Sequence, residues 1–206
     1  MTRPRQLIIG CIALFLVVSV YLYVPKNKLE RIQHSGTLHV LTRVDPTTYF
    51  QSPQGYSGLE YDLVMLFAKE IGVKVNFEVP DNFSKILSGI SAGKADIAAA
   101  GLTVTPQRQQ SIRFAPAYHE ITEQIVYKSD HRRPLNINDL DRGILEVAKG
   151  TSHVDSLMAL KQSNPKLEWA INDNIDTNGL LYLLHEGLID YTTADSNQIL
   201  LIRRFY

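Results

Sequence analysis

The sequence predicts an α/β fold built from two similar lobes. Apolar patterns typical of strands and helices alternate over residues 36–100, and the alternation starts again after residue 122. A Gly-x-x-Asp link precedes a strand pattern in both halves, at 93–96 and at 187–190. Alternating strands and helices are typical of a mostly parallel sheet covered by helices. With 206 residues and 45% hydrophobic content, the chain can bury one sizeable core or two small ones.

The first half contains three predicted strands and two predicted helices, in the order 36–42 (strand), 58–71 (helix), 73–79 (strand), 83–91 (helix) and 96–100 (strand). The first two strands alternate apolar and polar residues. The helix at 58–71 repeats apolar residues every three or four positions and ends at Gly72. The last strand ends in three alanines, which indicates a closely packed sheet.

The second half repeats this order after a strand at 122–128. Its predicted elements are a strand at 145–149, a helix at 152–162, a strand at 167–171, a helix at 177–185 and a strand at 190–194. Aligning the two Gly-x-x-Asp links puts Asp195 opposite Gly101, so both strands end in a polar turn. Two such turns are expected to face each other across a cleft between lobes, although Gly-x-x-Asp is also a common helix-to-strand link.

The turn after the alanine strand is the candidate ligand-binding element. Gly101 allows the backbone to approach a ligand closely, and Thr103, Thr105 and Arg108 follow it. In open α/β sheets the carboxyl ends of the strands form the ligand-binding edge. The planar guanidinium of an arginine suits a carboxylate. The alternative is an ordinary strand-to-helix turn with a solvated arginine.

Composition narrows the classes of partner. The 21 basic and 21 acidic residues cancel, and no long run of either sign appears. We therefore expect no nucleic-acid partner and favour a small neutral or zwitterionic ligand. The single cysteine, Cys11, excludes an internal disulfide, and no two of the six histidines are three or four residues apart. These spacings predict no metal site, and nothing in the sequence predicts a cofactor.

Residues 1–24 differ from the rest of the chain. Arg3 and Arg5 precede an 18-residue stretch, 7–24, that carries no charge. Such a stretch is typical of a signal peptide or of an N-terminal membrane anchor. The positive-inside rule then places the remaining residues outside the cytoplasm, so we expect an exported, periplasmic, membrane-associated protein.

Five motifs in order carry a resemblance to a known family. They are the first strand at 36–42, Gly-Leu-Glu-Tyr-Asp-Leu at 58–63, Gly-Lys-Ala-Asp at 93–96, Ala-Gly-Leu-Thr-Val-Thr-Pro-Gln-Arg at 100–108 and Phe-Ala-Pro-Ala-Tyr at 114–118. Over about residues 36–206 the chain resembles the family 3 extracytoplasmic solute-binding proteins. The resemblance implies a two-lobed, periplasmic-binding-protein-like α/β fold, with lobe one at 36–122 and lobe two at 123–206. It also implies an incomplete second lobe and return crossover, because a complete domain returns to lobe one through another crossing strand.

Within this family, segments 124–128, 147–150 and 188–196 look most like the N-terminal domains of membrane-bound lytic murein transglycosylases. These are exported, outer-membrane-associated enzymes that cleave peptidoglycan with a lysozyme-like module. The resemblance implies a ligand-sensing domain that meets peptidoglycan through its parent protein and the membrane through its N-terminus. No Glu here is followed by Ser, the family's catalytic pair, so we expect this chain alone to be non-catalytic.

Two other functions remain open. One is an amino-acid-binding protein that serves an ABC-type importer. The other is an enzyme on the same fold, such as a dehydratase acting on a small carboxylic acid. An enzyme needs an acid/base pair in the cleft, for which Glu60 and Asp62 are the nearby acidic residues.

The resemblance also implies roles for individual residues. Arg108 would bind the α-carboxylate of an amino acid or muropeptide, and Thr103 would add a hydroxyl and an N–H. The Thr151 N–H would bind the same carboxylate at the start of a helix, and Asp195 would accept the ammonium group. The alternatives are that Thr151 is only an N-cap and that Asp195 only caps the helix after it.

Two further positions are weaker candidates. Glu60 lies three residues after Ser57 in a Ser-x-x-Glu pattern, so helix capping is favoured over ligand binding. Tyr49 and its neighbour Phe50 fall near the place of the family's ring-stacking aromatic residue.

Overall fold

The computed structural model describes residues 12, 14, 27–131 and 133–203. Apart from Ile12 and Leu14, the predicted signal or anchor at 1–24 lies outside these residues. No helix within the described part of the chain combines the length and the apolar character that a bilayer crossing requires.

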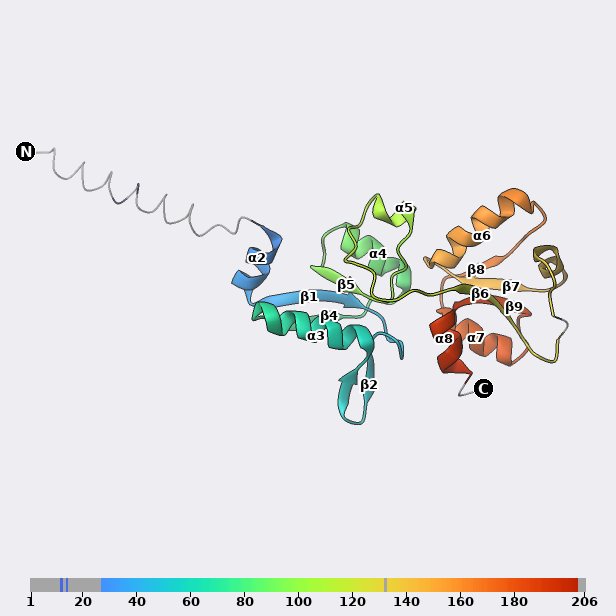
Figure 1. Cartoon of the computed structure of the whole chain (residues 1–206), viewed down its shortest axis with the longest axis horizontal. Helices are drawn as coiled ribbons and strands as arrows, with labels where there is room; N and C mark the ends of the chain where they lie inside the picture. The colour runs from blue at the N-terminus through green and yellow to red at the C-terminus, as the bar shows by residue number, and fades with distance from the viewer. Residues whose placement is uncertain (1–11, 13, 15–26, 132, 204–206) are drawn as a thin grey trace, which may run out of the picture.

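Lobe one is built on a three-stranded parallel sheet in the order β4-β1-β5. Its strands are β1 (Thr37–Thr42), β4 (Lys74–Glu78) and β5 (Ile97–Ala99). Helices α3 (Leu59–Ile71) and α4 (Phe83–Ser91) cover its two faces, and α2 (Lys28–Ser35) leads into β1 (Figure 1).

The core of lobe one follows from the alternation of side chains along β1. Leu38 and Val40 point to one face and pack with Val64 and Ala68 of α3. Leu41 points to the other face, where its apolar cluster includes Ile86 of α4. A strand buried on both faces in this way is typical of parallel sheets.

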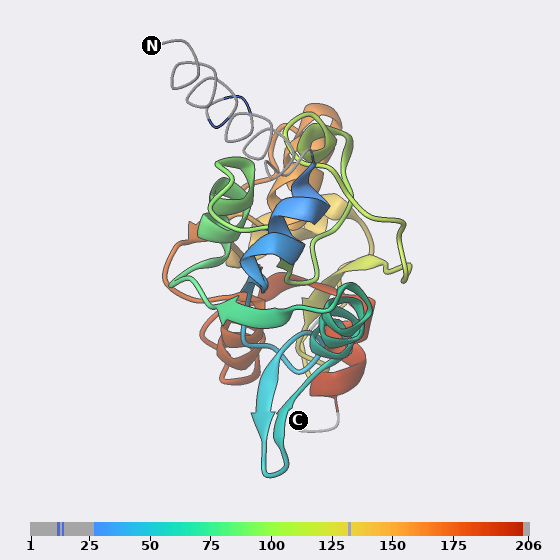
Figure 2. The same ribbon diagram turned by 90° about the vertical axis from the view of Figure 1, so that its left-hand side faces the viewer.

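A hairpin of β2 (Phe50–Ser52) and β3 (Gly55–Ser57) follows β1. Figures 1 and 2 show it projecting from the body of lobe one. After β5, the chain forms the short helix α5 (Pro106–Gln109) and then crosses to the second sheet.

Lobe two is built on a four-stranded sheet in the order β6-β9-β7-β8. Its strands are β6 (Glu123–Tyr127), β7 (Leu145–Ala148), β8 (Ala170–Asn172) and β9 (Tyr191–Asp195), and only β6 is antiparallel to its neighbour. Helix α6 (Ser152–Ser163) covers one face and α7 (Thr177–His185) the other, with the 3-10 helix η1 (Ile137–Arg142) and α8 (Ser196–Ile202) beside them.

The predicted two-lobed α/β fold is confirmed. Helices α4 and α7 have the predicted bounds, and the other predicted helices and strands lie within a few residues of prediction. The structure adds elements that were not predicted, namely α2, the β2–β3 hairpin, α5, η1 and α8. The strand predicted at 167–171 begins only at Ala170, because Leu167 is taken into the apolar cluster beneath α6.

Candidate ligand-binding site

Arg108 lies where the two lobes meet. Although it is an arginine, only 7% of its surface is exposed. Its Nη1 donates to the carbonyl oxygen of Thr103 in its own lobe at 3.0 Å. Its Nη2 donates to the carbonyl oxygen of Gly150 in lobe two, also at 3.0 Å. These two bonds fix the plane of the guanidinium between the lobes.

Gly150 allows this close approach. Its φ of 81° lies in the left-handed region, which favours glycine. A Cβ at this position would lie 3.0 Å from Ser84, at the start of α4 in lobe one. The backbones of the two lobes are therefore in direct contact beside Arg108.

Asp45 forms a second connection between the lobes. This lobe-one carboxylate is 1% exposed and accepts from the side-chain amide of Asn178 in lobe two at 2.8 Å. The amide of Gln198, also in lobe two, lies 3.5 Å away. Burial acts to raise the pKa of Asp45, but Arg43, Thr47 and Asn178 outweigh it and hold the pKa below the ordinary value.

Lobe two presents negative charge to Arg108. Burial lowers the pKa of Arg108, and the carboxylates of Asp155, Glu123 and Asp195 act in the opposite direction. Asp195 ends β9 and is the N-cap residue of α8. Its Oδ1 lies 3.0 Å from Nε2 of His153, a buried residue in the first turn of α6.

Two of the candidate threonines, Thr151 and Thr105, lie at helix starts. Thr151 is the N-cap residue of α6, but its hydroxyl donates back to the carbonyl of Ala148 at 2.8 Å rather than capping the helix. Thr105 caps α5 by accepting from the N–H of Arg108 at 3.2 Å. Thr103 contributes its carbonyl to the guanidinium, while its side chain remains half-buried.

The capping interpretation of Glu60 is wrong. The N-cap of α3 is Gly58, and no side chain caps this helix. Glu60 is instead 7% exposed, and it accepts from the N–H of Gly101 at 2.8 Å and from the Tyr118 hydroxyl at 2.5 Å. Burial raises its pKa, partly offset by these donors. The carboxylate thus ties α3 to the loop after β5 and to the crossing segment, which a local pattern does not reveal.

Tyr49 belongs to a ring cluster at the base of the hairpin. Its ring stacks on Tyr56 at a centroid distance of 4.8 Å and on Phe77 at 5.0 Å, and Tyr61 lies 5.9 Å away. Burial and the neighbouring tyrosine Tyr56 raise the pKa of Tyr49 to about 12. One face of this ring is therefore already covered by Tyr56.

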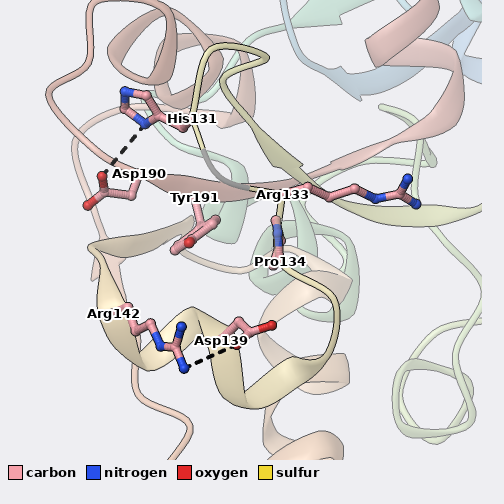
Figure 3. A pocket seen from close by; sticks show the side chains of 7 residues that line it. All are labelled: His131, Arg133, Pro134, Asp139, Arg142, Asp190 and Tyr191. Atoms are coloured by element: carbon pink, nitrogen blue, oxygen red, sulfur yellow. Dashed lines mark ion pairs between the residues drawn. The ribbon is translucent and has the colours of Figure 1, made fainter.

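A separate pocket of about 280 Å³ lies in lobe two and includes no predicted site residue (Figure 3). Its charged side chains are largely paired, Arg142 with Asp139 at 3.6 Å and His131 with Asp190 at 4.0 Å. Figure 3 shows Arg133 extending away from the other residues. The surface between the lobes, with its buried arginine and facing carboxylates, is the stronger candidate.

Comparison with known proteins shows to which family the chain belongs. The model of the bacterial extracellular solute-binding proteins, family 3, matches residues 37–179. The chain belongs to this family. Solved structures of similar fold include an ancestral arginine-binding protein bound to arginine, at 27% identity with a TM-score of 0.72 over 82% of this chain and 74% of that one. The ancestral amino-acid-binding protein AncCDT-1, a precursor of cyclohexadienyl dehydratase, is 28% identical with a TM-score of 0.74, over 87% of this chain and 78% of that one.

Among curated proteins, this family 3 chain is similar to membrane-bound lytic murein transglycosylase F. The protein from Pseudomonas savastanoi pv. phaseolicola is 39% identical over 187 residues, which is 90% of this chain and 38% of that protein. The protein from Alkalilimnicola ehrlichii is 38% identical over 183 residues, 88% of this chain and 37% of that protein. The chain thus spans less than two fifths of the length of these relatives.

Several residues of the site were not predicted. Tyr118, Gly150 and His153 contact predicted residues of the site, and Asp45 joins the two lobes through Asn178. Tyr118 lies in the motif at 114–118 that indicated the family. Gly150 lies in the segment at 147–150 that also carried the resemblance. Asp45 and His153 carry no local signal, because their partners lie 133 and 42 positions away in the sequence.

Proposed function

We propose that this chain binds the zwitterionic group of an amino acid or a peptidoglycan stem peptide between its lobes, with the ligand α-carboxylate on Arg108. The observation that carries the proposal is the placement of Arg108, buried at the junction and held by one carbonyl from each lobe. A guanidinium has five N–H donors, so two bonds to the backbone leave three for a ligand. A pre-oriented guanidinium loses little freedom when a carboxylate binds.

The opposite end of the ligand faces lobe two. Asp195 is the proposed acceptor for the ammonium, and Glu123 and Asp155 add to the negative potential around it. The backbone N–H groups that open α6 after Thr151 offer further donors for the carboxylate. A site with a cation in one lobe and anions in the other selects two charges at a fixed separation.

The similarity to lytic murein transglycosylase F supports a regulatory role for this site. We propose that the chain is the ligand-sensing domain of such an exported, membrane-associated protein, and that ligand binding reports on peptidoglycan turnover. Thr103, Gly101 and, more weakly, Glu60 and Tyr49 complete the proposed site. Glu60 acts there by holding the Gly101 N–H rather than by touching the ligand.

A second candidate function is amino-acid delivery to an ABC-type importer. The titles of the solved neighbours favour it, since one is an arginine-binding protein bound to arginine. The two functions differ in ligand size. A sensor of peptidoglycan turnover prefers stem peptides, whereas an importer component prefers a free amino acid.

Calorimetric titration of the full 206-residue chain with free amino acids and with stem peptides tests the proposal. Arg108→Ala is expected to weaken binding by at least about 30-fold, because removing one member of a desolvated charge pair costs about 2 kcal/mol or more. Asp195→Ala is expected to weaken it to a similar extent. Arg113→Ala, which removes an exposed arginine five residues away, is the matched control and should leave affinity within about twofold.

Binding that survives both Arg108→Ala and Asp195→Ala would move the site elsewhere. If no amino acid or stem peptide binds the folded wild-type chain, the proposed ligand class is wrong.

A further inference from the structure

Three side chains converge beneath the first turn of α6, far apart in sequence but close in space. Glu123 begins β6 and Asp195 ends β9, and the two are direct partners in the antiparallel ladder. His153 comes from α6 and points its Nε2 at Asp195 Oδ1, 3.0 Å away. One potential metal-binding atom from each of the three residues lies within 4.8 Å of the other two.

We propose that Glu123, His153 and Asp195 form a binding site for a divalent transition-metal ion such as Zn²⁺. One imidazole nitrogen and two carboxylate oxygens are a common ligand set for such ions, and they leave coordination positions open. Two ligand atoms bonded at about 2.1 Å in tetrahedral geometry are about 3.4 Å apart. The 3.0 Å between His153 Nε2 and Asp195 Oδ1 is close to this value, and the ligand atom of Glu123 lies within 4.8 Å of those of the other two residues.

The surroundings of Glu123 fit this role. The hydroxyl of Ser156, one turn along α6 from His153, donates to Glu123 Oε2 at 2.5 Å. That bond orients the carboxylate and leaves Oε1 for the ion. Hydrogen bonds of this kind, from neighbours to ligating carboxylates, are typical of metal sites.

Two buried polar atoms near the cluster have no partner within the described residues. His153 is only 3% exposed, and its Nδ1, the ring nitrogen that does not face Asp195, has no hydrogen-bond partner there. The hydroxyl of Thr193, on the same face of β9 as Asp195, is also buried and unpartnered within the described chain. Buried polar atoms are nearly always satisfied, and exceptions frequently mark a site for water or an ion.

The charge balance favours a divalent ion over a neutral ligand. The guanidinium of Arg108 faces the carboxylates of Asp155, Glu123 and Asp195, so this group carries two excess negative charges. A divalent cation bound at Glu123, His153 and Asp195 neutralises this excess.

The ligand types also indicate which ion binds. Mg²⁺ and Ca²⁺ prefer sites made entirely of oxygen atoms, whereas an imidazole favours Zn²⁺ and its transition-metal neighbours. The absence of closely spaced histidines predicted no metal site. That argument covers only ligands that lie close in sequence, and His153 is 42 residues from Asp195.

The test is titration of the metal-free full chain with Zn²⁺ by calorimetry, with Ca²⁺ as a comparison. Wild-type protein should bind one Zn²⁺ and no Ca²⁺. His153→Ala, and separately Glu123→Gln, should weaken Zn²⁺ binding by at least about 100-fold, and Ser156→Ala by about 10-fold. His131→Ala is the matched control, because this exposed histidine also lies near carboxylates, 4.0 Å from Asp130 and from Asp190.

Circular dichroism checks that each variant is folded. If His153→Ala fails to fold, Glu123→Gln carries the test, since it keeps the size of the side chain. Zn²⁺ binding that is unchanged in Glu123→Gln, or that is lost only in His131→Ala, would overturn the proposal. So would a folded wild-type chain that binds no Zn²⁺.

Arg108→Ala separates this inference from the proposed function. It removes the carboxylate donor but also a positive charge near the cluster. It should therefore weaken amino-acid binding while leaving Zn²⁺ affinity equal or higher. Asp195 is common to both proposed sites, whereas Arg108 belongs only to the carboxylate site. Parallel loss of both affinities in folded Arg108→Ala would therefore contradict the metal site proposed here.

Discussion

The sheets of the two lobes share the same strand order, but the sheet of lobe two has an additional strand at one edge. The order β4-β1-β5 in lobe one matches β8-β7-β9 in lobe two, with equivalent helices on equivalent faces. Lobe two has a fourth strand, β6, paired antiparallel along β9. Within the described residues, β5 in lobe one has β1 as its only partner and no strand on its other side.

The helices reflect the same difference. Lobe one exposes four large apolar residues along one stripe of α3: Leu59, Leu63, Leu66 and Phe67, each at least 42% exposed. In α7 of lobe two, by contrast, Leu180, Leu181 and Leu184 are buried, although Tyr182 is 48% exposed. Helix α7 therefore hides most of its apolar surface, whereas lobe one leaves the apolar face of α3 and the edge of β5 open.

The largest effect on stability is expected in the closed core of lobe two. Leu180 in α7 is fully buried, and Leu180→Ala removes packing and leaves a cavity. This should lower the free energy of unfolding by about 2 to 5 kcal/mol. Urea denaturation followed by circular dichroism measures it.

Leu188→Ala is the matched control, since that leucine is 63% exposed and its loss should change stability by less than about 0.5 kcal/mol. Equal effects of the two substitutions would contradict the burial on which the comparison between the lobes rests.

An intermediate effect is expected where the lobes are joined. Asp45→Ala removes the buried acceptor of Asn178 and should cost about 1.5 to 3 kcal/mol, the range for a hydrogen bond to a charged group. With the lobes less coupled, unfolding should become broader or split into two transitions. Differential scanning calorimetry measures both changes.

The pH dependence gives a second measure of the same contact. Because the pKa of Asp45 is lowered in the folded protein, its stabilisation is present above the unfolded value of 3.8. It is lost as the pH falls from there through the lower folded pKa. In the Asp45→Asn variant, the free energy of unfolding should lack this part of its decrease at low pH. If the stability of Asp45→Asn falls with decreasing pH in the same way as that of the wild type, Asp45 does not couple the lobes electrostatically.

The fold could be predicted from the sequence because its signals are local. Helix α7 and strand β1 are visible in apolar periodicity alone, and Gly72 ends α3 as expected. The strand at 167–171 was placed too early, since an isolated Leu167 contributes to the core from a loop as readily as from a strand.

The site could be predicted only in part. Arg108 was identified because it ends a turn that follows a strand, a local pattern. The interpretation of Glu60 failed because Ser-x-x-Glu matches a capping box, whereas the distant Gly101 N–H and Tyr118 hydroxyl compete for the same carboxylate. The partnerships of Asp45 with Asn178 and of His153 with Asp195 depend on how the lobes meet, which no short window of sequence contains.

The smallest effect on stability is expected on the exposed stripe of α3, where the consequence is instead self-association. Exposed apolar patches promote contacts between molecules, so the full chain should associate as its concentration rises. Leu63→Ser with Leu66→Ser should change the free energy of unfolding by less than about 1 kcal/mol, because these side chains are 42% and 65% exposed. The same double variant should lower the fraction of associated protein in sedimentation velocity experiments.

Met158→Ser on α6 is the matched control for this stripe, since Met158 is equally an apolar residue on a helix surface, at 54% exposure, but belongs to lobe two. If association is driven by the open face of lobe one, Met158→Ser should leave it unchanged. Association that falls equally in both variants would mean that exposed apolar area in general drives it. The difference between the lobes would then be one of strand pairing alone, and the unpaired edge of β5 would be the next surface to alter, by placing a lysine at Ala98.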